Sequence, residues 1–172
     1  WSRRLRHREL SHPQGMTPLP LPSIASLEQE ERDLVLPRFT HDEVWLLGSR
    51  LAERARREIL PVMIDIRRPG SILFRAAMSG TTADQDSWVE RKSATAFRFE
   101  ASTLLVGLRL EADGRDPFTD GWLDAVRYTL AGGAVPIRVA GAGVVAVATV
   151  SGLASQDDHA LVVDGLRGLV TG

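Results

Sequence analysis

Hydrophobic residues recur at helical spacing in the segment that follows Phe39. Their positions fall on one face of a predicted helix: Val44, Leu47, Leu51, Ala55 and Ile59. Thr40 and Glu43 have the spacing of a capping box, in which each side chain binds a free backbone amide at the start of a helix. The pattern therefore predicts a helix from about residue 40 to 59, and the similar pair Ser26 and Gln29 predicts a shorter helix over about 26–33.

Alternation of apolar and polar residues predicts two β-hairpins. In the first, Val62, Ile64 and Ile66 point to one side, and a turn over 68–71 with proline and glycine leads into a strand over 71–78. In the second, strands over 134–139 and 144–150 flank a turn that contains glycines. A further short strand is predicted over 34–36.

The remaining predicted elements are a loop over 112–121 and three helices, over 83–98 after Thr82, over 102–110, and over 156–169 with Ser155 and Asp158 as its caps. This order predicts an α+β fold in which two β-hairpins share one antiparallel sheet flanked by helices. The strand over 144–150 is apolar on both faces, so both faces should be covered. Two arrangements would cover both faces. In the first, helices pack on both faces; in the second, helices pack on one face and another subunit covers the other.

Composition restricts the class of protein. The chain has 172 residues, a net charge of −1 and no cysteine, which excludes disulfides, thiolate catalysis and cysteine-ligated metals. Basic residues with interleaved aromatic residues form no patch beyond the arginine-rich start, so nucleic acid is not an expected partner. The longest apolar run, residues 140–150, is shorter than the roughly 20 residues that span a bilayer, so no membrane partner is expected and we predict a cytoplasmic protein.

The start of the chain predicts a boundary between an extension and the folded domain. Its arginine-rich residues are not followed by the apolar stretch of a secretory signal. Residues 1–22 are therefore predicted to be a disordered or non-native extension, with Met16 as a candidate natural start, and residues 23–172 to form a single domain.

Three stretches are distinctive in combination: GTTADQDSWVERK (80–92), GGAVPI (132–137) and VSGLASQDDHALVV (150–163). With them, about residues 25–170 resemble the uncharacterised protein family 0303, a branch of the haem-degrading-domain superfamily that also holds HbpS-like and GlcG-like proteins. The resemblance implies a haem-degrading-domain-like domain with a profilin-like (GlcG-like) fold, homo-oligomers, and haem as a ligand. The family usually has a histidine before the two glycines, whereas this chain has Ala131 there, so any role of that histidine is missing.

Asp157, Asp158 and His159 stand side by side where the last helix is predicted to begin. Unpaired amides and the helix dipole stabilise carboxylates in a first turn, which accounts for the two aspartates. A cap does not need a histidine, and imidazole is a common ligand of haem iron. His159 is therefore either part of this helix start or a residue of a ligand site or subunit contact.

A polar and aromatic stripe is predicted on the helix over 83–98, where Asp84, Trp88, Arg91 and Lys92 are three or four residues apart. The indole could stack on a planar ligand while the cationic side chains hold a propionate or another carboxylate. The alternative is an ion pair within the helix, with Trp88 packed in the core.

Gly132 and Gly133 lack the spacing of a phosphate-binding loop. They permit either a tight entry into the following strand or a close approach at the rim of a pocket. Tyr128, shortly before them, is a candidate hydrogen-bond donor to a ligand, a candidate haem ligand, or an anchor for this turn.

No nucleophile–base–acid arrangement and no metal-binding motif can be identified, so neither catalytic residues nor a metal site are predicted. We expect a homo-oligomeric protein that binds a small ligand, with haem as the leading candidate. Haem would place His159 or Tyr128 near the iron and Arg91 or Lys92 near the propionates. The alternative is a non-enzymatic assembly or interaction module without a haem function.

Overall fold

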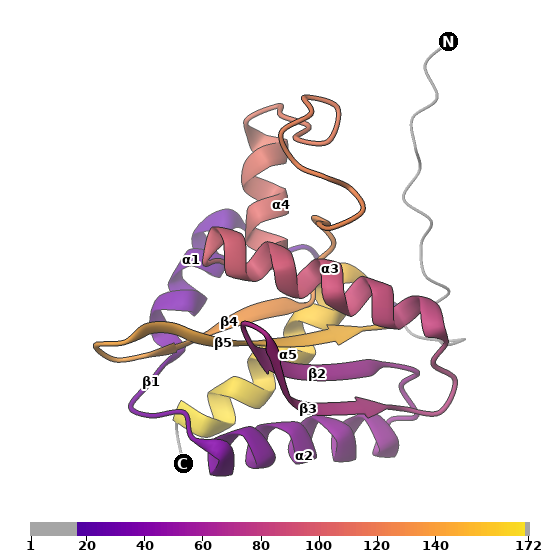
Figure 1. The fold of residues 1–172 in the computed structure, drawn as a ribbon, viewed down its shortest axis with the longest axis vertical. Coiled ribbons are helices and arrows are strands. Elements are labelled where there is room, and N and C mark those ends of the chain that lie inside the picture. Colours follow the sequence, from indigo (N-terminus) through magenta and orange to yellow (C-terminus); the bar gives the residue numbers. More distant parts are fainter. Residues whose placement is uncertain (1–16, 171–172) are drawn as a thin grey trace.

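One five-stranded sheet organises residues 17–170, the part of the chain that the structure, a computed structural model, describes (Figure 1). Its helices are α1 (Ile24–Asp33), α2 (His41–Arg57), α3 (Ala83–Phe99), α4 (Thr103–Ala112) and α5 (Ser155–Val170). Its strands are β1 (Val35–Leu36), β2 (Met63–Arg68), β3 (Ser71–Ala77), β4 (Ala134–Val139) and β5 (Gly143–Ser151).

The strands lie in the order β1-β4-β5-β2-β3. The hairpins β2–β3 and β4–β5 join where β5 pairs antiparallel with β2. This confirms the predicted α+β fold with two hairpins in one sheet. The short strand β1 pairs parallel with β4, so the sheet is mixed at that edge.

Helices cover both faces of the sheet. In Figure 1, α3 crosses in front of the strands and α5 passes behind them. On the side of α2 and α5, Ile64 and Ala148 belong to the main core, and on the other side Val147 packs with Ala96 of α3. Each fully buried aliphatic side chain contributes about 1.5–3 kcal/mol to the stability of this layering. Both faces of β5 are therefore covered by helices of the same chain, the first of the two predicted arrangements.

Local capping chemistry sets where the helices begin. The predicted capping box of α2 is present, because the Thr40 amide donates to Glu43 Oε2 at 2.7 Å and Thr40 Oγ1 accepts from the Asp42 amide at 3.3 Å. The predicted cap of α1 is wrong. Ser23, which has extended backbone angles, is the cap and its Oγ accepts from the Ser26 amide at 3.1 Å, so the helix begins at Ile24.

The start of the described chain runs along the first turn of α5. The Leu19 amide donates to Asp157 Oδ1 at 3.0 Å, and Gln156 Nε2 donates to the Leu19 carbonyl at 2.9 Å. Residues 1–16 of the predicted extension lie outside the described residues. These contacts hold Leu19 against the domain.

Candidate functional site

A layer of buried polar side chains lies between α3 and the end of β5. Ser93 Oγ and Thr149 Oγ1 are 2.9 Å apart, so the two hydroxyls share a hydrogen bond. Gln85 Nε2 donates to the carbonyls of Pro61 at 2.7 Å and Ser151 at 3.1 Å. These bonds satisfy polar groups that would otherwise be costly to bury, and they fix α3 on the sheet.

The centre of this layer is an ion pair between Lys92 and Asp158. Lys92 Nζ lies 2.7 Å from Asp158 Oδ2 and donates to the Val150 carbonyl at 3.1 Å. Asp158 Oδ1 accepts from the Leu153 amide at 2.9 Å and Oδ2 from the Gly152 amide at 3.3 Å. Burial raises the pKa of the Asp158 carboxyl, while the Lys92 ammonium and the two amides act against that rise. The pair connects α3 on one face of the sheet with α5 on the other.

This geometry corrects the predicted caps of α5. The Asp158 carboxylate does not pair with Ser155, because it turns back to the amides of residues 152 and 153 and to Lys92. A helix start needs only a local acceptor, whereas this carboxylate holds a strand end and a second helix. Its role could not be found from the first-turn pattern alone.

The predicted glycine pair packs against the ion pair. A Cβ atom on Gly133 would lie 2.8 Å from Lys92 Nζ, and one on Gly132 would lie 2.6 Å from the Ser155 carbonyl. The structure therefore brings Lys92, Gly132 and Gly133 together around Asp158. Because Lys92 and Asp158 are almost completely buried, these glycines belong to a packed junction.

The predicted stripe on α3 divides into two parts. Lys92 points inward, whereas Asp84, Trp88 and Arg91 remain together on the outer side. Trp88 Nε1 donates to Asp84 Oδ2 at 3.1 Å, and the Arg91 guanidinium lies 4.0 Å from the centroid of the indole. Trp88 is half-buried, so it is not the core residue of the alternative prediction, and Lys92 is too deeply buried to reach a propionate.

His159 lies on the opposite side of the sheet from Trp88, against α1. Its Nε2 is 2.7 Å from Glu30 Oε1, and Glu30 Oε2 accepts from Arg167 at 2.8 Å. The histidine lines a cleft of about 370 Å³, yet only 4 % of it is exposed. Its Nδ1 is buried and has no hydrogen-bond partner among the described residues. The structure therefore does not bring His159 and Trp88 to one site.

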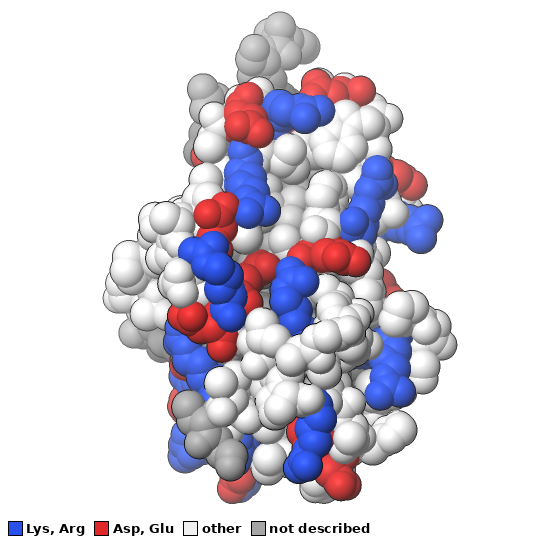
Figure 2. Space-filling view, turned by 90° about the vertical axis from the view of Figure 1, so that its left-hand side faces the viewer, with Lys and Arg blue, Asp and Glu red and all other residues white. Residues whose placement is uncertain are grey.

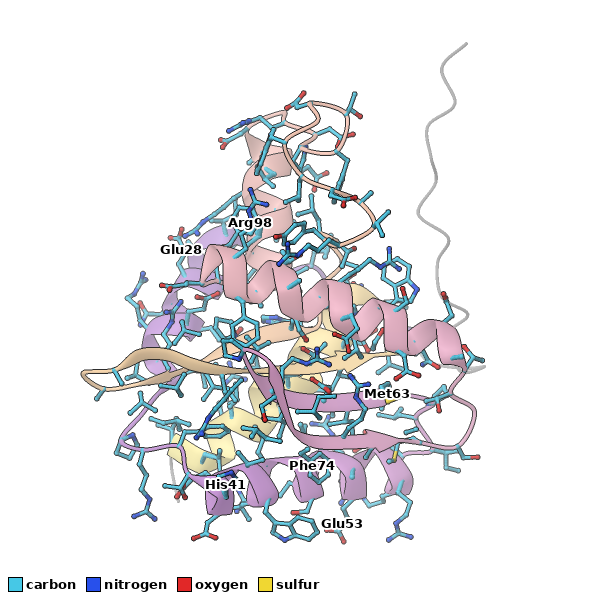
Figure 3. The ribbon with its side chains drawn as sticks, viewed as in Figure 1. Glu28, His41, Glu53, Met63, Phe74 and Arg98 are labelled. Atoms are coloured by element: carbon cyan, nitrogen blue, oxygen red, sulfur yellow. The ribbon has the colours of Figure 1, made fainter. Side chains whose placement is uncertain are left out.

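Tyr128 lies in a group of aromatic rings and guanidinium groups that we call the Tyr128 cluster, formed by Arg98, Phe99, Trp122, Arg127 and Tyr128. The guanidinium carbons of Arg98 and Arg127 are 5.0 and 5.4 Å from the centroid of the Tyr128 ring. Arg98 is also 5.9 Å from the Trp122 ring, which packs edge-on against Phe99 at 6.3 Å. Figure 3 shows Arg98 near the C-terminal end of α3, on the side of α4.

Sequence reasoning missed Arg98 and Trp122. The sequence did contain one signal of this cluster: an arginine precedes an aromatic residue twice, at Arg98–Phe99 and at Arg127–Tyr128. Nothing in the sequence alone shows that the end of α3 and the segment before β4 meet.

A second charged group, the Asp65 network, lies where α3 passes over β2 and β3. Asp65, which is fully buried, accepts from Arg67 at 2.5 and 3.0 Å and from Arg75 at 2.9 Å. Both arginines also bind Glu90 of α3, with Arg75 Nη2 at 2.9 Å from Oε1. The hydrogen bond from Arg67, aided by Arg75 and opposed by burial, lowers the pKa of Glu90 from 4.5 to about 2.

The Glu90 carboxylate should make stability depend on pH. Because its pKa is lower in the folded chain than in the unfolded chain, its contribution is fully present above pH 4.5 and is lost as the pH falls towards 2. Glu90 is 53 % exposed, so solvent screens the pairs and we expect only about 1 kcal/mol. Urea unfolding of the wild type and Glu90→Gln should show a difference at neutral pH that shrinks at about pH 3. A difference independent of pH would contradict this assignment.

Residues 17–170 contain neither a side-chain cluster suited to a metal ion nor a membrane-spanning helix. No group of three or more histidine, aspartate or glutamate side chains there is placed to hold a metal ion. No helix within the same residues is long and apolar enough to cross a bilayer.

Comparison with known proteins places this fold in a family. Residues 39–167 match the family described as haem degrading protein HbpS-like. A UPF0303 protein of Streptomyces avermitilis is 47 % identical over 150 residues, which is 87 % of this chain and 92 % of that protein. The crystal structure of the Ybr137w protein has a TM-score of 0.79 and 30 % identity, over 87 % of this chain and 88 % of that one.

A more distant likeness concerns the fold alone. The structure described as the PduOC:heme complex has a TM-score of 0.61 and 15 % identity, over 75 % of this chain and 93 % of that chain. Together with the matches above, it agrees with the predicted GlcG-like architecture. The chain belongs to the UPF0303 family, within the superfamily of HbpS-like haem-degrading proteins.

Proposed function

We propose that the chain binds haem at the Tyr128 cluster, with Tyr128 at the iron and Arg98 and Arg127 at the propionates. The family is described by haem degradation, and a protein of similar fold is described in complex with heme. Tyrosine is one of the side chains that hold haem iron in proteins. Haem would bring a Lewis-acidic iron to this site, and the residues here would hold and orient it.

One observation carries the choice of Tyr128 over His159: how accessible each side chain is. Tyr128 is half-buried, and its hydroxyl makes no hydrogen bond to any described residue. His159 has its Nε2 bound to Glu30 and its Nδ1 buried, so neither nitrogen is open to a ligand. The two guanidinium groups beside Tyr128 suit the bidentate binding of carboxylates.

The contacts of Lys92 and Arg91 argue against the two propionate partners that the sequence predicted. Lys92 is occupied by Asp158 inside the protein. The Arg91 guanidinium stacks on the Trp88 ring, 4.0 Å from its centroid. Arg98 and Arg127 take their place in this proposal.

Titration of haemin into micromolar protein tests whether haem binds at the Tyr128 cluster. We expect a saturable Soret shift in the wild type, altered visible bands in Tyr128→Phe, and at least tenfold weaker binding in Arg98→Gln, since each lost charge-assisted pair is worth about 1.5–3 kcal/mol. Arg56→Gln is the matched control, because it removes an exposed arginine on α2 that is no part of the Tyr128 cluster, and it should bind as the wild type does. No saturable shift, or unchanged spectra in Tyr128→Phe, would contradict the proposal.

A second candidate is self-assembly without haem. Trp45 and Ile72 are exposed apolar residues on α2 and β3, and β3 pairs with β2 alone among the described strands. An unpaired strand edge with apolar side chains is a common site of association between chains. Empty haem titrations of a protein whose mass by light scattering is a multiple of the chain mass would favour this candidate.

A further inference from the structure

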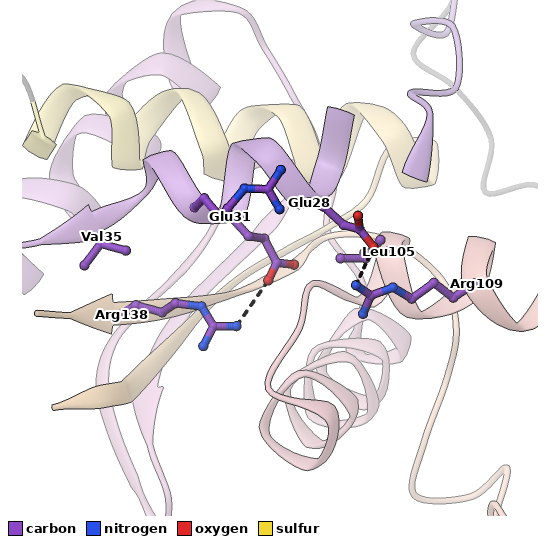
Figure 4. Close-up of a pocket in the computed structure, with 7 residues that line it drawn as sticks. Glu28, Glu31, Val35, Leu105, Arg109 and Arg138 are labelled. Carbon is purple, nitrogen blue, oxygen red and sulfur yellow. Dashed lines mark hydrogen bonds and ion pairs between the residues drawn. The ribbon is translucent and has the colours of Figure 1, made fainter. Parts of the chain in front are cut away.

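A charged groove that shares no residue with the Tyr128 cluster lies between α1, α4 and β4. It measures about 590 Å³, a size that is typical of small-ligand sites. Its lining residues are Glu28, Glu31, Arg32, Val35, Leu105, Arg109 and Arg138. Figure 4 shows Glu28 and Glu31 of α1 pointing towards Arg109 of α4 and Arg138 of β4. We call it the α1–α4 groove.

Part of the groove is held in place by the fold. Glu31 Oε1 accepts from the Ser102 amide at 2.7 Å, and Glu31 Oε2 lies 3.2 Å from Arg138 Nη2. Arg138 also donates to the Glu100 carbonyl. Across the groove, Arg109 and Glu28 are paired at 2.7 Å. Side chains already fixed in this way lose little conformational entropy when a ligand binds.

Guanidinium groups outnumber carboxylates among the residues that line the groove. Three arginines face two glutamates, and both glutamates are paired with arginines. The third arginine, Arg32, bonds only to the Gln29 amide oxygen among the described residues, at 2.9 and 3.2 Å. Figure 2, which looks onto the side where α1 and the β4–β5 turn lie, shows basic and acidic side chains mixed on this face. The excess positive charge is therefore local to the groove and does not spread over the face.

We propose that the α1–α4 groove binds a small organic anion that carries a carboxylate or phosphate group, with Arg32 as its anchor. A planar guanidinium without a carboxylate partner can bind either group through two parallel hydrogen bonds. Val35 and Leu105 supply an apolar wall for the carbon part of such a ligand. The paired Arg109 and Arg138 add positive potential on either side without needing to give up their glutamates.

Calorimetric titration at low salt tests this site, with succinate and inorganic phosphate as separate probes and sodium chloride as the control for ionic strength. We expect saturable binding of at least one probe and at least tenfold weaker binding in Arg32→Gln. Arg32 is exposed, so this variant should fold normally. Arg56→Gln, which removes an exposed arginine on α2, is the matched control and should bind as the wild type does.

The two probes distinguish a carboxylate ligand from a phosphate ligand, and the haem titration distinguishes the groove from the proposed haem site. Binding of succinate alone assigns a carboxylate ligand, and binding of phosphate alone assigns a phosphate ligand. Heats that follow ionic strength alone, or equal losses in Arg32→Gln and Arg56→Gln, would overturn the proposal. The Arg32→Gln variant should keep its haem affinity, because the groove and the Tyr128 cluster share no residue.

Discussion

Replacing Asp158 with asparagine is expected to lower the free energy of unfolding by about 3–5 kcal/mol, because it leaves a buried ammonium without its counter-charge. Lys92 is 1 % exposed and Asp158 is 0 % exposed, so water cannot take the place of the lost carboxylate. The single asparagine oxygen can still accept from the Leu153 amide, but the new amide nitrogen then faces the Gly152 N–H and the Lys92 ammonium. The change therefore removes both the charge and one acceptor. The thermal midpoint should fall by about 6–20 °C for a domain of this size.

A double-mutant cycle separates the ion pair from the packing around it. Lys92→Met should also destabilise the protein, but the double variant should lose clearly less than the two single losses together, because neither charge then remains unpaired. The matched control is Asp164→Asn, which weakens solvent-exposed pairs with Arg54 at 3.0 Å and Arg167 at 3.2 Å and should cost at most about 1 kcal/mol. Equal losses in Asp158→Asn and Asp164→Asn in urea unfolding would contradict a buried, coupled pair.

The elements of the fold could be predicted because their signals are local. The alternation of Val62, Ile64 and Ile66 predicted β2, since one face of the strand must meet the core. The Thr40 capping box predicted the start of α2 within one residue. The apolar strand β5 predicted that both sheet faces are covered, although only the structure could decide that helices of the same chain cover them.

The candidate site was harder to predict, because its residues act through partners far away in the chain. Lys92 and Asp158 are 66 residues apart in the sequence. A signal was present, since Lys92 lies in helical phase with the buried residues Gln85, Val89 and Ala96 as well as near the outer stripe. A lysine is rarely buried unless it is paired, so the residue type alone favoured placing the Lys92 side chain on the outer face of α3. The tertiary contact with α5 reversed that preference.

Gly133→Ala is expected to lower the free energy of unfolding by about 3–5 kcal/mol, through backbone strain and a steric clash together. Gly133 has φ +125, a conformation that residues with a side chain rarely adopt. The added Cβ would lie 2.4 Å from the Val150 carbonyl oxygen and 2.8 Å from Asp158 Cβ. The backbone cannot move away easily, because the Gly133 carbonyl accepts from the Val150 amide at 2.8 Å.

The clash also reaches the ion pair, because the same Cβ would lie 2.8 Å from Lys92 Nζ. We therefore expect Gly133→Ala and Asp158→Asn to be non-additive, since both act on the same contact between α3 and α5. Gly141→Ala is the matched control: its φ is +76, but no atom lies within 4 Å of the added Cβ, so only the backbone cost of about 1–2 kcal/mol applies. Urea unfolding of the two variants measures the difference. If Gly141→Ala lost as much stability as Gly133→Ala, the close packing of the glycine on the buried pair would be refuted, and positive φ alone would account for the preference for glycine there.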